Sequence, residues 1–265
     1  MRDAPARRFG ATFFRTCVTP LALYPAPLSR NDTFDRSRDG ATGGNGVNPG
    51  EPNRVLRKTQ GDDPRAKIRR AMRKQRAELS APERLAAADA IAEVVGELPE
   101  LTTDQYVAGY WAVGGEVSLH RIVPPLIRRE QTYLLPVLSP DGDASLRFAP
   151  WRPGAIVAPN RYGIPEPQCR ADALVEAAEI ELVLLPLVAF DRRGHRLGTG
   201  AGYYDRSFAF LKEVERPALP LLVGVAYAFQ EVESLAVEAW DVPLDFVATE
   251  HELIECTHKV RKRAS

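Results

Sequence analysis

The feature that most constrains the fold is a glycine-rich segment, residues 194–206, which follows the longest apolar run of the chain, residues 182–190. Glycine occupies every second position over 198–202. Because glycine has no Cβ atom, the backbone amides of this segment can turn toward an anion. Residues 207–211 are predicted to form a helix, whose N-terminal end would favour a bound phosphate. The segment therefore predicts a phosphate-binding loop between a strand and a helix.

The glycine spacing differs from the standard nucleotide-binding motifs. A P-loop requires Gly-Lys-Ser/Thr, and a dinucleotide-binding fold requires Gly-x-Gly-x-x-Gly. Glycine-rich turns after strands are also common for purely structural reasons. Two flanking side chains favour phosphate binding here, since Arg196 offers a fixed cation and Asp205 a hard oxygen ligand for Mg²⁺.

Alternating strands and helices are predicted along most of the chain. One helix is expected to begin at Pro64 and another after the capping box that joins Ser80 to Glu83. Shorter helices are expected over 119–129 and 171–178, and strands over 106–113, 132–138, 145–151, 180–190, 221–227 and 246–249. This order predicts an α/β fold with a mostly parallel sheet and helices on both faces. Ligands bind such sheets at the carboxyl ends of strands, where the glycine-rich segment falls.

Residues 1–63 differ in composition from the rest of the chain. They contain the glycine-rich stretch 40–46, scattered prolines and no sustained apolar period. Because such a segment cannot bury enough apolar surface to offset its chain entropy, we expect disorder over 1–63. Five arginines and one acid in the first 30 residues resemble a transit peptide, but no amphipathic helix follows, which favours a basic tail or a start codon placed too far upstream. We expect one domain over 64–252 and a basic tail over 253–265.

Charge and cysteine content restrict the class of protein. The 35 basic and 35 acidic residues balance, so no overall attraction to nucleic acid or to a membrane surface is expected. Cys17, Cys169 and Cys256 lie far apart without C-x-x-C spacing, which indicates a reducing compartment and neither a disulfide framework nor a zinc site. The longest apolar run is far shorter than the roughly 20 residues that a membrane helix needs. We expect a soluble, cytoplasmic protein.

The first predicted helix carries seven cations over residues 65–76 and an apolar face of Ile68, Met72 and Leu79. Such cations can form a solvated surface, bind a nucleic-acid backbone, or supply a phosphate site made elsewhere. The sequence alone leaves the two binding interpretations open.

Several acids fall near the expected ligand edge of the sheet. Glu116 follows the strand predicted to end near Val113, although an isolated glutamate after two glycines is more often a surface loop residue. Either Asp241 or Asp245 could complete a magnesium site with Asp205, because Mg²⁺ is usually held by one or two carboxylates together with phosphates and water. No Ser-His-Asp or Cys-His arrangement is evident, which argues against covalent hydrolase chemistry.

Residues 184–206 resemble the signature of the 5-formyltetrahydrofolate cyclo-ligase family, also called methenyltetrahydrofolate synthetases. The similarity continues, in the family's order, through the basic first helix and through residues 110–116, 160–167 and 240–245, and it covers about residues 64–250. It implies a single three-layer α/β domain similar to the NagB/RpiA/CoA-transferase-like fold.

The resemblance implies an ATP- and Mg²⁺-dependent ligase of one-carbon metabolism. Such an enzyme converts 5-formyltetrahydrofolate to 5,10-methenyltetrahydrofolate and releases ADP and phosphate. We expect a monomer whose partners are a folate and ATP, with no nucleic acid or membrane. The alternative is a non-catalytic folate- or nucleotide-binding protein of the same fold, because Thr199 and Ala201 stand where many members carry other side chains.

The resemblance also implies roles for individual residues. The expected catalytic residues are Arg196 and Tyr203. The expected folate-binding residues are Trp111, Glu116, Thr199 and Tyr203, and the expected metal ligands are Asp205 and Asp241. The expected ATP-binding residues are Arg65, Lys67, Arg69, Arg196, Gly198, Thr199, Gly200, Ala201, Gly202, Tyr203 and Tyr204. The family's usual helix lysine falls on Arg65, but Lys67 is close enough to leave the register open.

Overall fold

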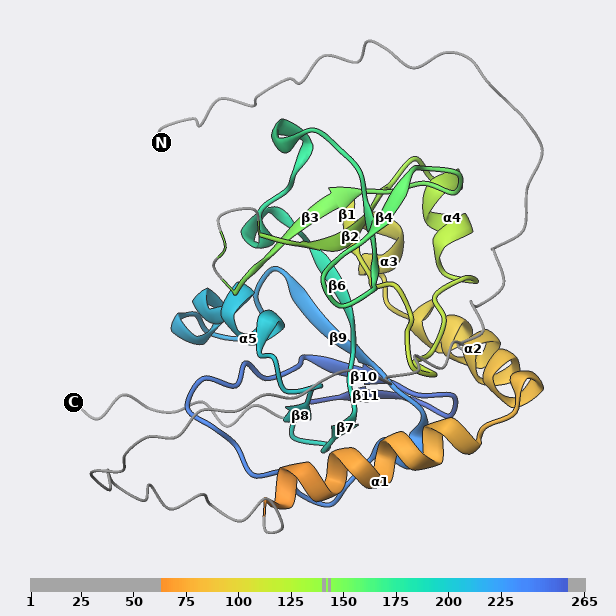
Figure 1. Ribbon diagram of the computed structural model, residues 1–265, viewed down its shortest axis with the longest axis vertical. Coiled ribbons are helices and arrows are strands. Elements are labelled where there is room, and N and C mark those ends of the chain that lie inside the picture. Colours follow the sequence, from red (N-terminus) through yellow and green to blue (C-terminus); the bar gives the residue numbers. More distant parts are fainter. Residues whose placement is uncertain (1–62, 140–141, 143, 257–265) are drawn as a thin grey trace, which may run out of the picture. The chain divides into compact units, whose positions relative to one another are not determined.

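The structure is a computed structural model that describes residues 63–139, 142 and 144–256. A seven-stranded sheet runs through this part of the chain in the order β11-β10-β9-β6-β1-β2-β3 (Figure 1). Five inner strands are parallel: β10 (Phe246–Ala248), β9 (Leu221–Val225), β6 (Leu182–Pro186), β1 (Tyr106–Ala108) and β2 (Thr132–Leu138). The edge strands pair antiparallel: β11 (Leu253–Glu255) and β3 (Leu146–Pro150). The predicted mostly parallel sheet is confirmed.

Local chemistry sets the starts of the two long helices. The described helices are α1 (Pro64–Glu78), α2 (Ala81–Val95), α3 (Glu100–Thr103), α4 (Val123–Arg128) and α5 (Tyr203–Ser207). The Asp63 side chain accepts a 3.0 Å hydrogen bond from the backbone amide of Arg65 and so caps α1. Ser80 and Glu83 form the predicted reciprocal capping box at the start of α2. None of the described helices has the length and apolar content needed to cross a membrane.

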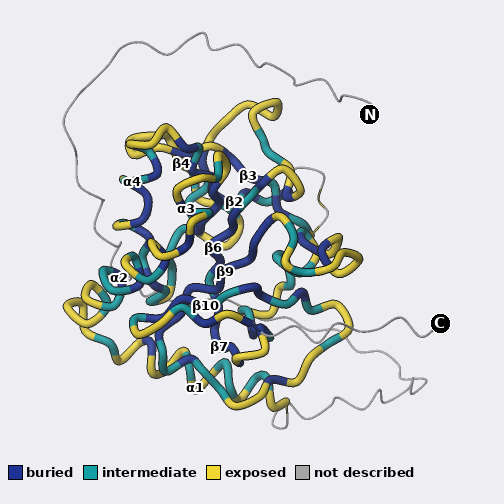
Figure 2. Tube along the Cα trace, turned by 180° about the vertical axis from the view of Figure 1, so that it is seen from behind, coloured by how far each residue is buried: buried dark blue, intermediate teal, exposed yellow. Residues whose placement is uncertain are grey.

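The sheet separates two apolar cores, because successive residues of a strand point to opposite faces. Leu182 and Leu184 of β6 belong to a core that includes buried side chains of α2, α3 and α4. Val183 and Leu185 belong to a second core, which includes buried side chains that follow α5. In Figure 2 the central strands are buried, while much of the helical surface is exposed. Both faces of the sheet are therefore covered, as predicted.

Two short hairpins lie outside the sheet and build the ligand edge. One joins β4 (Val157–Pro159) to β5 (Pro165–Pro167), and the other joins β7 (Ala189–Phe190) to β8 (Arg196–Leu197). Helix α1 packs Ile68 and Met72 against an apolar cluster that contains residues of β7 and β8. The cations of α1 are thereby brought next to the glycine-rich segment that follows β8.

Several predicted boundaries are wrong. The strand predicted over 180–190 divides into β6 and β7, because the chain leaves the sheet after Pro186 and the carbonyls of residues 187 and 188 accept hydrogen bonds from the Gln230 amide instead. The strand predicted over 106–113 pairs only as β1. The helix predicted over 119–129 contracts to α4, whose first turn contains proline, a residue that cannot continue a helix from its N-terminal side.

Further differences concern the helix after the glycines and the ends of the chain. The sequence predicts a helix over 207–211. The structure instead has α5, which begins earlier, at Tyr203, and is followed by the 3₁₀ turn Ala209–Glu213. The helix predicted over 171–178 is replaced by two 3₁₀ turns, Ala171–Ala173 and Ala177–Glu179. The predicted domain boundary at residue 252 falls too early, since β11 belongs to the sheet. Residues 1–62 of the segment predicted to be disordered, and residues 257–265 of the predicted tail, lie outside the described residues.

Gly194, in the β7–β8 hairpin, should tolerate no side chain. Its φ is +82°, and a Cβ atom there would lie 2.6 Å from the Leu244 carbonyl oxygen. We expect Gly194→Ala to lower the free energy of unfolding by about 2–4 kcal/mol, through strain and overlap with the backbone. Urea unfolding followed by circular dichroism measures this. Gly198→Ala is the matched control, because open space surrounds its Cβ position; equal losses in both variants would contradict the steric account.

Candidate active site

A cavity of about 320 Å³ lies at the carboxyl ends of β1, β2 and β6. Its wall combines segments that follow these strands with the glycine-rich loop and the β4–β5 hairpin. The lining includes Tyr110, Trp111, Glu116, Asn160, Tyr162, Glu166, Arg196, Gly198, Thr199, Ala201, Gly202, Tyr203, Tyr204 and Asp205. Most of the predicted site residues therefore meet in one cavity at the predicted edge of the sheet. Arg65, Lys67, Arg69, Gly200 and Asp241 are not part of its lining.

The glycine loop adopts a backbone conformation that other residues rarely accept. Gly200 has a φ of +112° and Gly202 a φ of +69°, and Gly202 is the N-cap of α5. Gly200 faces α1, because a Cβ atom there would lie 3.8 Å from the Arg69 guanidinium. The side chains of Thr199 and Ala201 are exposed. The loop thus presents its backbone between the cavity and the cations of α1.

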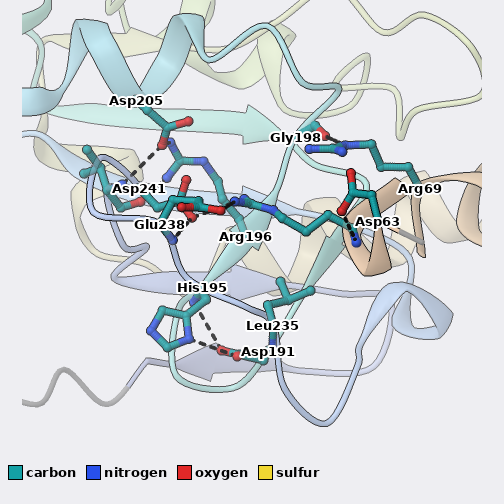
Figure 3. Close-up of polar contacts among 12 residues, drawn as sticks. Asp63, Arg69, Asp191, His195, Arg196, Gly198, Asp205, Leu235, Glu238 and Asp241 are labelled. Carbon is teal, nitrogen blue, oxygen red and sulfur yellow. Dashed lines mark hydrogen bonds and ion pairs between the residues drawn. The ribbon is translucent and has the colours of Figure 1, made fainter. Parts of the chain in front are cut away.

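A stripe of arginines on α1 follows the loop at four-residue spacing. Arg69 Nε donates to the Gly198 carbonyl at 2.9 Å, and Arg73 Nη2 donates to the Thr199 carbonyl at 3.3 Å. Arg65 Nη2 contacts Asp241 Oδ2 at 3.1 Å. Burial and the neighbouring Arg65 lower the pKa of Arg69. Figure 3 shows Arg69 extended from the helix to Gly198.

The contacts of α1 favour Arg65 over Lys67 as the cation at the ligand edge. Arg65 and Arg69 reach the ligand edge, whereas the exposed Lys67 side chain makes no hydrogen bond or ion pair with any described residue. Arg73 is a further cation of the stripe that sequence reasoning missed. Its position four residues after Arg69 is the signal that could have identified it, because residues four apart lie on one helix face.

Arg196 and Asp205 form a largely buried ion pair beside the cavity. Arg196 Nη2 donates to Asp205 Oδ1 at 2.5 Å, and Nη1 donates to the Val242 carbonyl. Burial lowers the pKa of the Arg196 guanidinium, and the charge of Asp205 opposes that shift. Arg196 therefore positions Asp205 and the segment before β10. Nη1 and Nη2 each hold a protein atom, while Arg196 also lines the cavity.

Asp205 and Asp241 fit the two-carboxylate site expected for Mg²⁺. Oδ1 of Asp205 accepts from Arg196 and from the Val242 amide at 3.2 Å, and Oδ2 of Asp241 accepts from Arg65 and from the Glu238 amide at 2.9 Å. Within the described residues the other oxygen of each carboxylate accepts no hydrogen bond. Figure 3 shows both acids grouped around Arg196. Each therefore retains one oxygen for a cation.

Asp245, the alternative partner of Asp205, is excluded from this site by its own contacts. Its carboxylate forms a buried ion pair with Arg216, whose Nε donates at 3.0 Å, and accepts from the Leu222 amide at 2.8 Å. Three or more His, Cys, Asp or Glu side chains do not gather as a metal site anywhere in the described residues. Any metal at Asp205 and Asp241 would thus need further oxygen ligands from phosphate or water.

Glu116 is a cavity residue, so the interpretation as a surface loop residue is wrong. Gly114 and Gly115, with φ of +57° and +79°, form the turn that carries it, and the Val113 amide donates to its Oε2 at 3.1 Å. Burial raises the pKa of the Glu116 carboxyl, while the charges of Arg76 and Arg73 lower it in part. A carboxylate in a mostly apolar wall is a strong acceptor for N–H donors of a ligand.

Aromatic rings line the cavity together with Glu116. Trp111 packs edge-to-face against Trp151, with ring centroids 5.7 Å apart, and is held as a wall of the cavity. Tyr204 stacks on Phe208 with an interplanar angle of 14°. Burial and the nearby Glu116 raise the pKa of the Tyr204 hydroxyl. These rings provide flat apolar surfaces beside a charged acceptor.

The β4–β5 hairpin borders the more exposed end of the cavity. Glu166 Oε1 accepts from the Leu138 amide at 2.9 Å and from Asn160 Nδ2 at 2.8 Å, which ties the hairpin to the end of β2. The Tyr162 and Tyr203 hydroxyls lie 3.0 Å apart. Hydrogen bonds from Tyr162 and Arg161 lower the pKa of Tyr203. Sequence reasoning assigned no site role to this hairpin, although residues 160–167 carry part of the resemblance.

Comparisons with known proteins agree on one family. The sequence profile of the 5-formyltetrahydrofolate cyclo-ligase family matches residues 62–250. The chain is 34% identical over 180 residues to the 5-formyltetrahydrofolate cyclo-ligase of Haemophilus influenzae, covering 68% of this chain and 94% of that protein. It is 32% identical over 157 residues to the enzyme of the same name from Escherichia coli, covering 59% of this chain and 84% of the relative.

Solved structures give the same result. An NMR structure of Aquifex aeolicus 5,10-methenyltetrahydrofolate synthetase superposes with a TM-score of 0.60 at 31% identity, covering 76% of this chain and 95% of that one. A 5,10-methenyltetrahydrofolate synthetase from Mycoplasma pneumoniae superposes with a TM-score of 0.54 at 24% identity, covering 71% of this chain and 100% of that one. The second match supports the fold alone.

Proposed function

This chain belongs to the 5-formyltetrahydrofolate cyclo-ligase family, and on that premise we propose that its cavity converts 5-formyltetrahydrofolate to 5,10-methenyltetrahydrofolate at the expense of ATP. The observation that carries the proposal is that one cavity is lined both by Glu116, a folate-binding candidate, and by the glycine loop, a phosphate-binding candidate. A ligase that joins these two substrates needs both surfaces within reach of one reacting carbon.

The chemistry requires activation of a poor leaving group. The formyl oxygen of the folate attacks the γ-phosphorus of ATP, the bond to the β-phosphate oxygen breaks, and ADP leaves. N10 of the folate then attacks the activated formyl carbon and loses its proton, and phosphate departs with the former formyl oxygen. Both steps depend on alignment and on stabilisation of phosphate charge more than on a dedicated base.

The phosphate-binding side is formed by α1, the glycine loop and the acid pair. Arg69 and Arg73 contact the loop, Arg65 contacts Asp241, and all three would offset the charge of the triphosphate. Asp205 and Asp241 would hold Mg²⁺, which supplies charge neutralisation at the phosphate oxygens when it is bound. Arg196 keeps Asp205 in position through their buried ion pair.

The folate-binding side is formed by Glu116, Trp111 and the loop. The Glu116 carboxylate would accept N–H donors of the pterin ring, with Trp111 as the adjacent aromatic wall. Tyr203 begins α5 directly after the loop and faces the cavity, so it would contact the folate close to the phosphate side. We further propose that the enzyme acts as a cytoplasmic monomer.

Purified protein given 5-formyltetrahydrofolate, ATP and Mg²⁺ is expected to generate the ultraviolet absorbance of methenyltetrahydrofolate. Omission of ATP or Mg²⁺ should abolish the signal. Folded protein that binds both substrates and forms no product would instead support a non-catalytic binding protein. That alternative is considered because Thr199 and Ala201 stand where many family members carry other side chains.

A further inference from the structure

We propose that Arg161 and Arg206, which contact the hydroxyl and the ring of the cavity residue Tyr203, form an anion subsite for the two carboxylates of the folate's glutamate tail. This inference rests on the proposed function, because it takes the bound substrate to be a folate. It assigns a contact to the end of the substrate that is distant from the reacting carbon.

The cavity has a closed end and an open end. Tyr110, at the closed end beside Glu116, is only 5% exposed, whereas Tyr162 in the β4–β5 hairpin is 55% exposed. A pterin bound to Glu116 would therefore direct the rest of the molecule toward Tyr162 and Tyr203. In a folate, the benzoyl group and then the glutamate extend from the pterin, so the glutamate carboxylates would emerge beside these two tyrosines.

Arg161 is held at this opening by the two tyrosines. Its Nη2 donates to the Tyr203 hydroxyl, and its guanidinium lies 5.2 Å from the centroid of the Tyr162 ring. The neighbouring residues Asn160 and Tyr162 both line the cavity. The guanidinium is therefore oriented at the rim before a ligand arrives, which reduces the entropy lost on binding.

Arg206 is held over the ring of Tyr203. Its guanidinium lies 5.3 Å from the centroid of the Tyr203 ring, Nε donates to the Ala144 carbonyl at 2.6 Å, and Nη2 donates to the Ala201 carbonyl at 2.5 Å. Backbone carbonyls fix the direction of this side chain without neutralising it. Its Nη1 makes no hydrogen bond with any described residue.

Neither cation has an acidic partner in the described part of the chain. By contrast, two other exposed arginines are paired with acids, since Arg170 pairs with Asp172 at 2.9 Å and Arg192 pairs with Glu231 at 2.7 Å. Two positioned and unpaired guanidinium groups at a cavity mouth are complementary to a ligand that ends in two carboxylates, because the guanidinium fork matches carboxylate geometry.

A phosphate of ATP is a second possible source of the anion, because Arg206 also contacts the glycine loop. The two sources are separated by comparing 5-formyltetrahydrofolate with 5-formyltetrahydropteroate, which lacks the glutamate. Isothermal titration gives the dissociation constants of both compounds for the wild-type protein, Arg161→Gln, Arg206→Gln and the double variant. Titration with ATP and Mg²⁺ forms the third arm.

We expect each single variant to raise the dissociation constant of 5-formyltetrahydrofolate about fivefold to tenfold. The dissociation constant of 5-formyltetrahydropteroate should change less than twofold. Arg161→Lys should retain part of the affinity, because it keeps the charge and loses the fork. Arg170→Gln is the matched control and should change neither constant. Because Arg161 is exposed, its variants test the proposal even if loss of the Arg206 contacts destabilises α5.

Equal weakening of both folate compounds would overturn the tail subsite, and a weakened ATP affinity with unchanged folate affinity would assign the arginines to phosphate. Either result leaves wild-type turnover of 5-formyltetrahydrofolate intact. Failure of the proposed function is recognised differently, by wild-type protein that forms no methenyltetrahydrofolate.

Discussion

Asp205→Asn should lower kcat/KM by about a thousandfold while the protein stays folded. The asparagine keeps an oxygen that can accept from Arg196 and from the Val242 amide, and it removes the charge that would hold Mg²⁺. Loss of one metal ligand and of the charge it carries removes several kcal/mol of transition-state stabilisation. Initial rates at several Mg²⁺ concentrations measure the effect, and high Mg²⁺ should restore part of the activity.

The choice of asparagine follows from the buried ion pair. Asp205→Ala would remove both the charge and the acceptor oxygen that face the Arg196 guanidinium, whose side chain is 5% exposed. Removing one partner of a buried pair costs about 3–5 kcal/mol, so activity and folding would be lost together. Asp172→Asn, which removes an exposed acid paired with Arg170, is the control for a general effect of charge. Wild-type kcat/KM in Asp205→Asn would refute the metal role.

Glu116→Gln should raise KM for 5-formyltetrahydrofolate by about 30-fold to 100-fold and leave KM for ATP unchanged. The carboxylate lies in a mostly apolar wall, where a charged acceptor for ligand N–H groups contributes about 2–3 kcal/mol. Glu213→Gln, in which an exposed glutamate outside the cavity is changed, should behave as the wild type. A proportional rise in both KM values would indicate a disturbed cavity instead.

The same residue predicts the acidic side of the pH profile. Burial raises the pKa of Glu116, so the carboxyl binds its proton at a higher pH than the ordinary value of about 4.3. Because the ionised form accepts the ligand's donors, log(kcat/KM) should fall as pH decreases through the raised pKa. This fall in log(kcat/KM) at low pH should be absent in Glu116→Gln. If the variant shows the same fall, the titrating group is another residue.

Local sequence patterns were sufficient to predict the sheet, the helix caps and the glycine loop. The Asp63 cap and the capping box of α2 depend on residues a few positions apart, and strand β2 is bounded as its apolar pattern indicates. The division of residues 180–190 into two strands could not be predicted in this way. It depends on Gln230, which is more than 40 positions away and whose side-chain amide donates hydrogen bonds to the backbone carbonyls where the chain leaves the sheet.

The candidate site shows the same limit. Resemblance and residue type identified the glycines, Glu116 and the acids, but the assignment of partners depends on the tertiary structure. Asp245 forms an ion pair with Arg216, and Asp241 forms one with Arg65. No sequence pattern indicates which arginine pairs with which aspartate. The site role of the β4–β5 hairpin was likewise invisible, because Tyr162 meets Tyr203 across 41 positions of sequence.

The central claim is that folate and ATP react with each other in this one cavity, and transfer of the formyl oxygen tests it most directly. Substrate labelled with oxygen-18 in the formyl group is incubated with the enzyme, ATP and Mg²⁺, and the released phosphate is analysed by mass spectrometry. We predict one labelled oxygen in each phosphate, formed in equal amount to methenyltetrahydrofolate. Unlabelled phosphate, with the label recovered in water, would contradict the account.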